Sequence, residues 1–250
     1  MKRLAVLLLA SAMAPAALAH DVRNDVQCDV HSDYSMRMHG KAYVFTRDDG
    51  PGKHVALGGG RLFVDGKEVA LTQADREHVR RFEAELNRMV PRAHEVVLEA
   101  TDIAFTALTE VARGFAGDGG SGTIARLEQA RRDVRADLAR QPIVLFSDPD
   151  LGKRVIAPVI TEYVPVIAGA AVRESLSAAF SGDEKRMRDF ERRMDRMGEE
   201  IERKVDKRAE ALEPKVEALC DSTRELDRIE QGLALRLDDG EPLDLLRASR

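Results

Sequence analysis

Histidines and carboxylates near the N-terminus are the clearest candidates for chemistry in this sequence. If the chain is cleaved after Ala19, His20 becomes the first residue, and its α-amine and imidazole could together chelate copper. His31 could supply a second imidazole. The sequence therefore predicts a copper or other metal site at His20 and His31, whereas the simpler interpretation is a coincidental histidine on a loose end. Further possible ligands nearby are His39, Asp21, Asp29 and Asp33.

Three stretches begin like catalytic or phosphate-binding motifs, and each lacks a residue that the motif needs. His94-Glu95 starts like the zinc-peptidase HExxH, but Leu98 stands where the second histidine belongs. Ser121 lies among glycines without the G-x-S-x-G spacing, and 58–60 is a glycine triplet without the GK[ST] of a P-loop. We therefore expect a protein that is not an enzyme, with a hydrolase using an unrecognised site as one alternative.

The first 19 residues have the pattern of a secretory signal peptide. Lys2 and Arg3 precede an apolar run from Leu4 to Met13, and Ala17-Leu18-Ala19 suits a signal peptidase. The apolar run is too short to cross a bilayer, so we expect no transmembrane segment in the mature chain. The sequence thus predicts export to the periplasm, with cleavage after Ala19.

Export gives the two cysteines a structural interpretation. Cys28 and Cys220 are the only cysteines, and an oxidising compartment favours a disulfide between them. Closing so long a loop would remove about 5 kcal/mol of unfolded-state entropy in the chain-entropy model. A redox-active pair would need the CxxC spacing that is absent here.

Composition argues against several classes of partner. Removing residues 1–19 takes away Lys2 and Arg3, which changes the formal charge from −5 to −7. An acidic chain is a poor ligand for nucleic acid. It also has no tryptophan and few other aromatic residues, so stacking platforms for bases or sugars are not expected. Envelope proteins or a second copy of the chain remain as partners.

The N-terminal segment, 20–71, has a β pattern. Residues 34–38 alternate in character, and 41–46 is rich in aromatic and β-branched residues. Asp65-Gly66 separates two short apolar runs and predicts a type I′ hairpin. We therefore expect a small antiparallel sheet ahead of the helices.

The segment 72–237 predicts a bundle of long amphipathic helices that forms one domain with the β segment. Thr72 and Asp75 resemble a capping box, and Pro91 is expected to end the first helix and to begin a second that runs to Phe115. We expect a glycine-rich loop at 117–122, and 238–250 as a flexible tail. The later helices are predicted at 123–140, at 149–180 as a kinked, buried helix with strand as the alternative, and over 183–237 as two helices with a break or a kink at Pro214.

The last of these stretches carries a continuous apolar stripe. Steps of three and four residues place its members on one helical face, and the run of fours favours a bundle over a long coiled coil. We expect this methionine-rich face to be core, and a pocket or a lipid-facing surface is the alternative. The stripe comprises Met187, Phe190, Met194, Met197, Ile201, Val205, Ala209, Leu212, Val216, Leu219, Thr223, Leu226, Glu230, Leu233 and Leu237.

The order of these features resembles a known family. An exported N-terminus, the early Cys28, a strand pair ending at Leu71-Thr72, successive helices, Leu219-Cys220 and the segment 226–230 are together similar to the YggN-like periplasmic proteins of Gram-negative bacteria. That family is a domain of unknown function, so the resemblance implies an envelope location and no catalytic residue. We thus expect an α+β, mostly α, exported protein with a non-catalytic binding or scaffold role, the copper and hydrolase alternatives remaining open.

Overall fold

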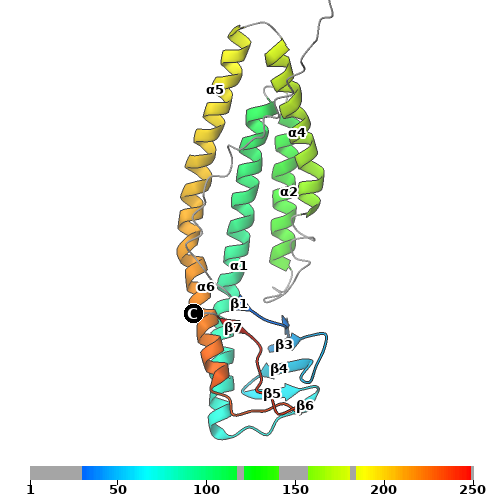
Figure 1. The fold of residues 1–250 in the computed structure, drawn as a ribbon, viewed down its shortest axis with the longest axis vertical. Helices are drawn as coiled ribbons and strands as arrows, with labels where there is room; N and C mark the ends of the chain where they lie inside the picture. The colour runs from blue at the N-terminus through cyan, green and yellow to red at the C-terminus, as the bar shows by residue number, and fades with distance from the viewer. Residues whose placement is uncertain (1–29, 117–120, 141–156, 181–183, 249–250) are drawn as a thin grey trace, which may run out of the picture.

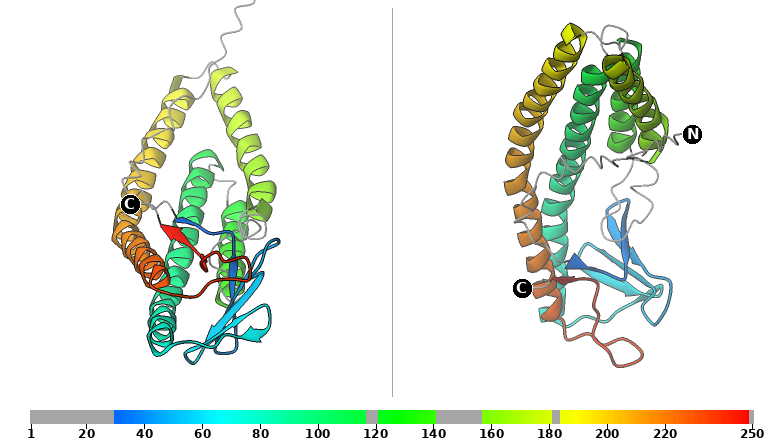
Figure 2. Two further views of the ribbon diagram at one scale, coloured as in Figure 1. Left: turned by 60° about the horizontal axis from the view of Figure 1, so that its bottom comes forward. Right: turned by 45° about the horizontal axis from the view of Figure 1, so that its top comes forward.

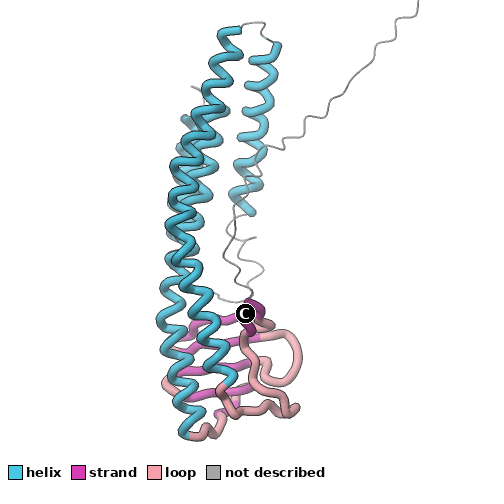
Figure 3. Tube along the Cα trace, turned by 60° about the vertical axis from the view of Figure 1, so that its left-hand side comes forward, coloured by secondary structure: helices cyan, strands magenta, loops and turns pink. Residues whose placement is uncertain are grey.

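The computed structural model describes residues 30–116, 121–140, 157–180 and 184–248. Its strands gather at one end, and its helices extend away from them (Figure 1, Figure 3). We call 30–90 together with 220–248 the head, and the described residues of 91–219 the arm. The fold is α+β and mostly helical, with a small antiparallel sheet ahead of long helices, which confirms the predicted class.

The sheet of the head is an antiparallel meander in which each strand pairs with the next one along the chain. Phe45 pairs with Val55 across two neighbouring strands, and both side chains are fully buried on the inner face. Asp65 and Gly66 have φ values of 48° and 80°, as a type I′ turn requires, so the predicted hairpin is confirmed. The strands are β2 (Ser35–His39), β3 (Ala42–Thr46), β4 (His54–Gly58), β5 (Arg61–Val64) and β6 (Lys67–Glu68).

A single helix, α1 (Gln73–Ala116), runs from the head into the arm. The Thr72 hydroxyl accepts a hydrogen bond from the backbone N–H of Asp75 and donates one to its carboxylate, so the capping box is present with aspartate in place of glutamate. The helix break expected at Pro91 is wrong. Proline removes one backbone hydrogen bond, but Met89 and Ala93 on either side are buried, and this packing keeps the helix continuous.

The helix break expected at Pro214 is wrong as well, because Pro214 lies inside a continuous helix and is exposed. The chain loses regular α geometry earlier, in a π-helical segment at 202–206, where one residue more is accommodated per turn. Ser121 and Gly122, which we expected in a loop, form the first turn of a helix. The arm consists of part of α1 with α2 (Ser121–Arg140), α4 (Ala157–Phe180), α5 (Glu184–Ile201), η2 (Glu202–Asp206) and α6 (Lys207–Gln231), whose last part enters the head.

The stretch predicted as a buried helix over 149–180 is helical from Ala157 onward, which excludes the strand alternative there, and 149–156 lies outside the described residues. The expectation that it is buried is only half right. Val159, Tyr163 and Ile167 pack into a core with α1 and α2, but the opposite face of α4 is exposed. Within the described ranges no helix is both long enough and apolar enough to cross a bilayer.

The C-terminal segment differs from the flexible tail that we expected at 238–250. Leu243, Leu245 and Leu246 are buried in the core of the head, and a short strand, β7 (Arg247–Ala248), pairs with β1 (Val30–His31). The segment returns from the end of α6 across the head, as the red trace in Figure 2 shows. Three leucines in four residues supply enough apolar area to hold it there.

Candidate functional site

Glu230 is the most deeply buried carboxylate that the structure describes in the head. It lies near the end of α6, where Oε1 accepts a hydrogen bond of 2.7 Å from the backbone N–H of Leu245 and Oε2 accepts one of 3.3 Å from that of Leu246. Burial raises the pKa of Glu230 to about 8, although the two hydrogen bonds by themselves lower it. The nearby charges of Asp244 and Asp227 also raise it. This side chain therefore fastens the C-terminal segment to α6.

Asp75 has a similar role at the start of α1. Its Oδ1 accepts a hydrogen bond of 2.9 Å from the backbone N–H of Ala234, which follows α6 in the chain. That bond and the one from the hydroxyl of Thr72 lower the pKa of Asp75. Both carboxylates bind backbone amides, so they serve the fold of the head and are not placed for acid–base catalysis.

A pocket of about 340 Å³ lies in the arm where α5 crosses α1. Its two carboxylates are engaged by cations: Glu110 pairs with Arg113 and with Lys204 at 2.9 Å, and Glu200 pairs with Lys204 at 2.8 Å. Hydrogen bonds from Lys204 and from Arg203 lower the pKa of Glu200, so this group is an ion-pair partner and a poor general acid. The lining residues are Glu110, Arg113, Gly114, Arg193, Arg196, Met197 and Glu200.

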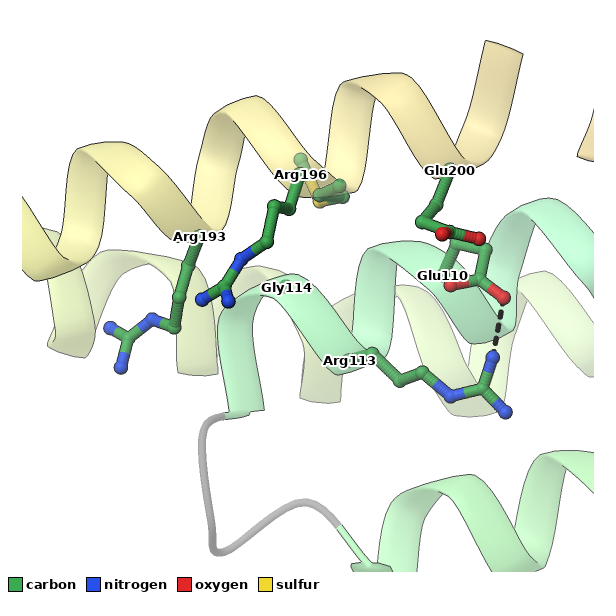
Figure 4. A pocket seen from close by; sticks show the side chains of 7 residues that line it. Glu110, Arg113, Gly114, Arg193, Arg196 and Glu200 are labelled. Carbon is green, nitrogen blue, oxygen red and sulfur yellow. Dashed lines mark hydrogen bonds and ion pairs between the residues drawn. The ribbon is translucent and has the colours of Figure 1, made fainter. Parts of the chain in front are cut away.

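The arginines of this pocket give it a chemical character. The side chains of Arg193 and Arg196 extend from α5 in the same direction past Gly114, away from the two glutamates (Figure 4). Two neighbouring guanidinium groups can bind a carboxylate or phosphate group through several hydrogen bonds. The pocket thus has two guanidinium groups at one end, of which that of Arg193 also lies 5.9 Å from the ring centre of Phe190, and two ion-paired carboxylates at the other.

The floor of the pocket is a close approach of two helices. A Cβ at Gly114 would lie 2.9 Å from Cγ of Met197 and closer still to its Sδ, so only glycine fits without a shift. The methionine-rich stripe thus packs along α1, as predicted for core. However, the structure fully buries no residue of α5, so the description of the stripe as core is only partly right there, whereas Thr223, Leu226 and Glu230 on α6 are buried.

A second groove, of about 380 Å³, separates α2 from α4. Asp133, Asp137 and Glu162 line it together with apolar side chains, and Tyr163 donates a hydrogen bond of 3.3 Å to the backbone carbonyl of Arg126. Burial raises the pKa of the Tyr163 hydroxyl. The charge of Glu162, which also lines the groove, and its hydrogen bond with the Tyr163 hydroxyl raise this pKa further.

α4 carries most of the large apolar side chains that are exposed among the described residues. Four of these lie on its outer face: Val164 at 43%, Val172 at 58%, Leu176 at 50% and Phe180 at 83%. They follow one another at spacings of four or eight residues, which places them on one row of the helix. We call the row Val164, Ala168, Val172, Leu176 and Phe180 the α4 ridge.

The predicted metal residues are not brought together in the part of the chain that the structure describes. His31 is exposed, and its Nε2 lies 3.2 Å from Oδ1 of Asp33. Across the described ranges no group of three or more His, Cys, Asp or Glu side chains is placed to hold a metal. His20 lies outside these ranges, so the copper site stays a prediction.

The predicted disulfide is likewise described at one end only. Cys220 is buried on α6, where the helix enters the head. Cys28 lies outside the described residues, so the bridge stays a prediction.

His94 is half-buried on α1, and Glu95 beside it pairs with Lys215 of α6 at 2.7 Å, as suits a residue of a helix surface.

Sequence reasoning missed Glu230 and the α4 ridge as features of interest. A signal for Glu230 was present, because a carboxylate inside an apolar helical stripe needs a partner when it is buried. A signal for the ridge was present too, since a helix with bulky apolar residues on more than one face needs cover on more than one side. Neither pattern says by itself what the partner is.

The fold places a helical arm on a small α+β head, and the described residues leave one apolar face of α4 exposed. The family model described as a protein of unknown function (DUF2884) matches residues 28–246, and the chain belongs to this family. The resemblance to YggN-like proteins is compatible with it. The comparisons with curated proteins and with solved structures find no match.

Proposed function

We propose that this protein is an exported, non-catalytic binding or scaffold protein of the bacterial cell envelope, and that it binds through its arm. The observation that carries the proposal is the α4 ridge. Contiguous exposed apolar surface of this kind marks interaction sites in soluble proteins, because water disfavours it. The opposite face of the same helix is packed in the arm, so α4 is held in place to present the ridge.

The carboxylates support a non-catalytic role. A general acid or base must reach substrate with its proton or lone pair available. Glu230 binds two backbone amides, and Glu110 and Glu200 are bound by Lys204 and arginines. The expected location in the periplasm rests on the signal-peptide pattern of residues 1–19.

A photo-crosslinking amino acid tests this function in living cells. We would place it at Leu176 on the ridge and, as a matched control, at Met38, an exposed apolar residue of the head. Adducts of defined mass at Leu176 and none at Met38 support binding through the arm. Equal labelling at both positions, or none at Leu176, overturns the proposal.

A second function, binding of an anionic group in the arm pocket, is favoured by the parallel side chains of Arg193 and Arg196. Inorganic phosphate should then raise the melting temperature of the mature protein more than chloride does at equal ionic strength. Arg196→Gln should abolish this difference. Arg188→Gln, on the same helix but outside the pocket, should retain it; loss in both variants or in neither would refute the site.

A further inference from the structure

The C-terminal segment, residues 232–248, crosses the head outside its main sheet and after its last helix (Figure 2). Its regular backbone pairing consists of β7, two residues long and paired with β1, and one bridge from Arg236 to Pro242. We propose that this segment is a pH-sensitive strap, which lifts from the head as a unit when Glu230 ionises and closes when Glu230 is protonated. This inference goes beyond the proposed binding role and is independent of the α4 ridge.

Carboxylates of two helices hold the segment by accepting hydrogen bonds from its backbone. The pairs are Asp75 of α1 with Ala234 at 2.9 Å, Glu230 of α6 with Leu245 at 2.7 Å and Leu246 at 3.3 Å, and Asp227 of α6 with Ala248 at 3.3 Å. Buried leucines of the segment add apolar contact with the head. Lifting the segment breaks these contacts and the pairing with β1, but it breaks no hydrogen bond of the five-stranded sheet. Local opening of this kind costs less free energy than unfolding the whole head.

Glu230 lies directly beneath the segment. It is only 4% exposed, and each of its two carboxyl oxygens meets a backbone amide of the segment. An ionised carboxylate in this place lacks the water that would solvate it in an open head. Lifting the segment restores that water while α6 stays folded. Ionisation of Glu230 therefore favours the open state.

The charges that face Glu230 come from α6 and from the segment itself. Asp227 and Asp244 oppose its ionisation, and Arg247 of β7 favours it. The side chain of Arg247 is 61% exposed and already pairs with Asp244, and it lies 3.8 Å from Asp33. An exposed cation shared among these carboxylates offsets little of the cost of burying a charge at Glu230.

Two further titratable side chains reach this region from other elements. Tyr34, ahead of β2, donates a hydrogen bond of 2.9 Å to the backbone carbonyl of Gly52, and burial raises the pKa of its hydroxyl, so it stays neutral. His78 of α1 lies against Gly232, where the segment begins. A histidine can also change charge near neutral pH, so the test has to separate His78 from Glu230.

The pH range of the strap follows from the two states of Glu230. Its pKa is about 8 while the segment is closed, and the exposed carboxyl of the open state ionises near the ordinary value of 4.5. Between these values opening releases a proton, so the ratio of open to closed molecules should rise about tenfold per pH unit. Above pH 8 the ratio should become constant, because Glu230 is then ionised in both states.

The test measures amide hydrogen exchange of the mature, full-length protein by mass spectrometry between pH 5 and pH 9. Each rate is divided by the intrinsic rate of an unstructured peptide at the same pH, which leaves the protection by structure. We expect the protection of 243–248 to fall about tenfold per pH unit up to pH 8 and to level off above it. It should also be lower at every pH than the protection of β3 and β4, which exchange only when the head unfolds.

Variants assign the effect to one carboxyl group. Glu230→Gln should make the protection of 243–248 independent of pH, whereas Glu217→Gln, at an exposed position of the same helix, should keep the wild-type decline. His78→Gln should keep it as well. If Glu230→Gln folds poorly, Asp244→Asn keeps the test decisive. It removes a charge that opposes the ionisation of Glu230, so the decline should end at a lower pH than in the wild type.

Equal protection of 243–248 and of β3 and β4 at every pH would mean that the segment leaves only when the head unfolds, and this overturns the inference. Constant protection in the wild type, or the wild-type decline in Glu230→Gln, overturns it too. Loss of the decline in His78→Gln would assign the change to the histidine and remove Glu230 from the account. None of these outcomes involves the α4 ridge, so failure of the strap leaves the proposed function standing.

Discussion

The buried carboxylate of Glu230 predicts how the stability of this protein changes with pH. Burial raises its pKa from 4.5 to about 8, so between these values the folded protein holds a proton that the unfolded chain has released. The free energy of unfolding must then fall as pH rises, by about 1.4 kcal/mol per pH unit. Between pH 5 and pH 7 this amounts to about 3 kcal/mol, a large part of the stability of an ordinary domain.

The groups that face Glu230 make the sign of this effect clear. Asp227 on the same helix, Asp244 on the C-terminal segment, Arg247 of β7 and the ring of Tyr34 face it. Both aspartates oppose its ionisation and Arg247 favours it, but burial is the largest effect. The pKa of Asp75 is lowered, so its contribution to stability is lost only when the pH falls into the acid range. The free energy that Asp75 contributes therefore does not change between pH 5 and pH 8. The decline of stability in this range therefore belongs to Glu230.

Glu230→Gln tests this reasoning, because an amide has the shape of the carboxyl and no proton to lose. The variant should lose stability at pH 5, where its amide meets the N–H of Leu246, and should show no decline toward pH 8. Urea denaturation followed by circular dichroism at each pH gives the free energies. Glu217→Gln, at an exposed position of α6, is the control and should keep the wild-type slope. A wild type that becomes more stable from pH 5 to pH 8, or a Glu230→Gln variant with the wild-type slope, would refute the account.

Three further predictions concern packing and the cysteines. Gly114→Ala should lower stability by about 1–3 kcal/mol through overpacking, and Met197→Ala in the same chain should reverse most of that loss in thermal melts. Leu246→Ala should cost about 2–5 kcal/mol in denaturant unfolding, since its side chain is fully buried; a cost near zero would mean that the C-terminal segment is loose after all. The intact mass of the exported chain should be two hydrogens below that of the reduced chain, reporting a bridge between Cys28 and Cys220; two free thiols would contradict it.

Local patterns predicted the head better than the arm. The turn at Asp65-Gly66 and the cap at Thr72 and Asp75 depend on residues close in sequence, and the structure has both. The helix breaks predicted at Pro91 and Pro214 were wrong. Each proline removes one backbone hydrogen bond, but the flanking turns stay packed against other helices. Tertiary packing decided those positions.

The C-terminal segment was missed for a similar reason. Its polar linker indicated a loose end, but three leucines after it find a core formed by the sheet, α1 and α6. The amides of Leu245 and Leu246 meet Glu230, which lies 15 and 16 residues earlier in the chain. A sequence shows an apolar cluster and a carboxylate, and only the fold shows that they meet.

The candidate surface was partly visible in the sequence as a mostly apolar helix around Val164 to Phe180. The prediction that this helix is buried assumed that every apolar face finds cover within the same chain. The arm offers α1 and α2 to one face of α4 and leaves the other open. That open face carries the proposed function.

The most direct test is the native mass of this protein purified from the cells that make it, for the wild type and for Ala168→Glu. Binding through the α4 ridge predicts a complex for the wild type and a single chain for the variant. A single, unbound chain in both preparations would contradict the claim that the arm exists to bind.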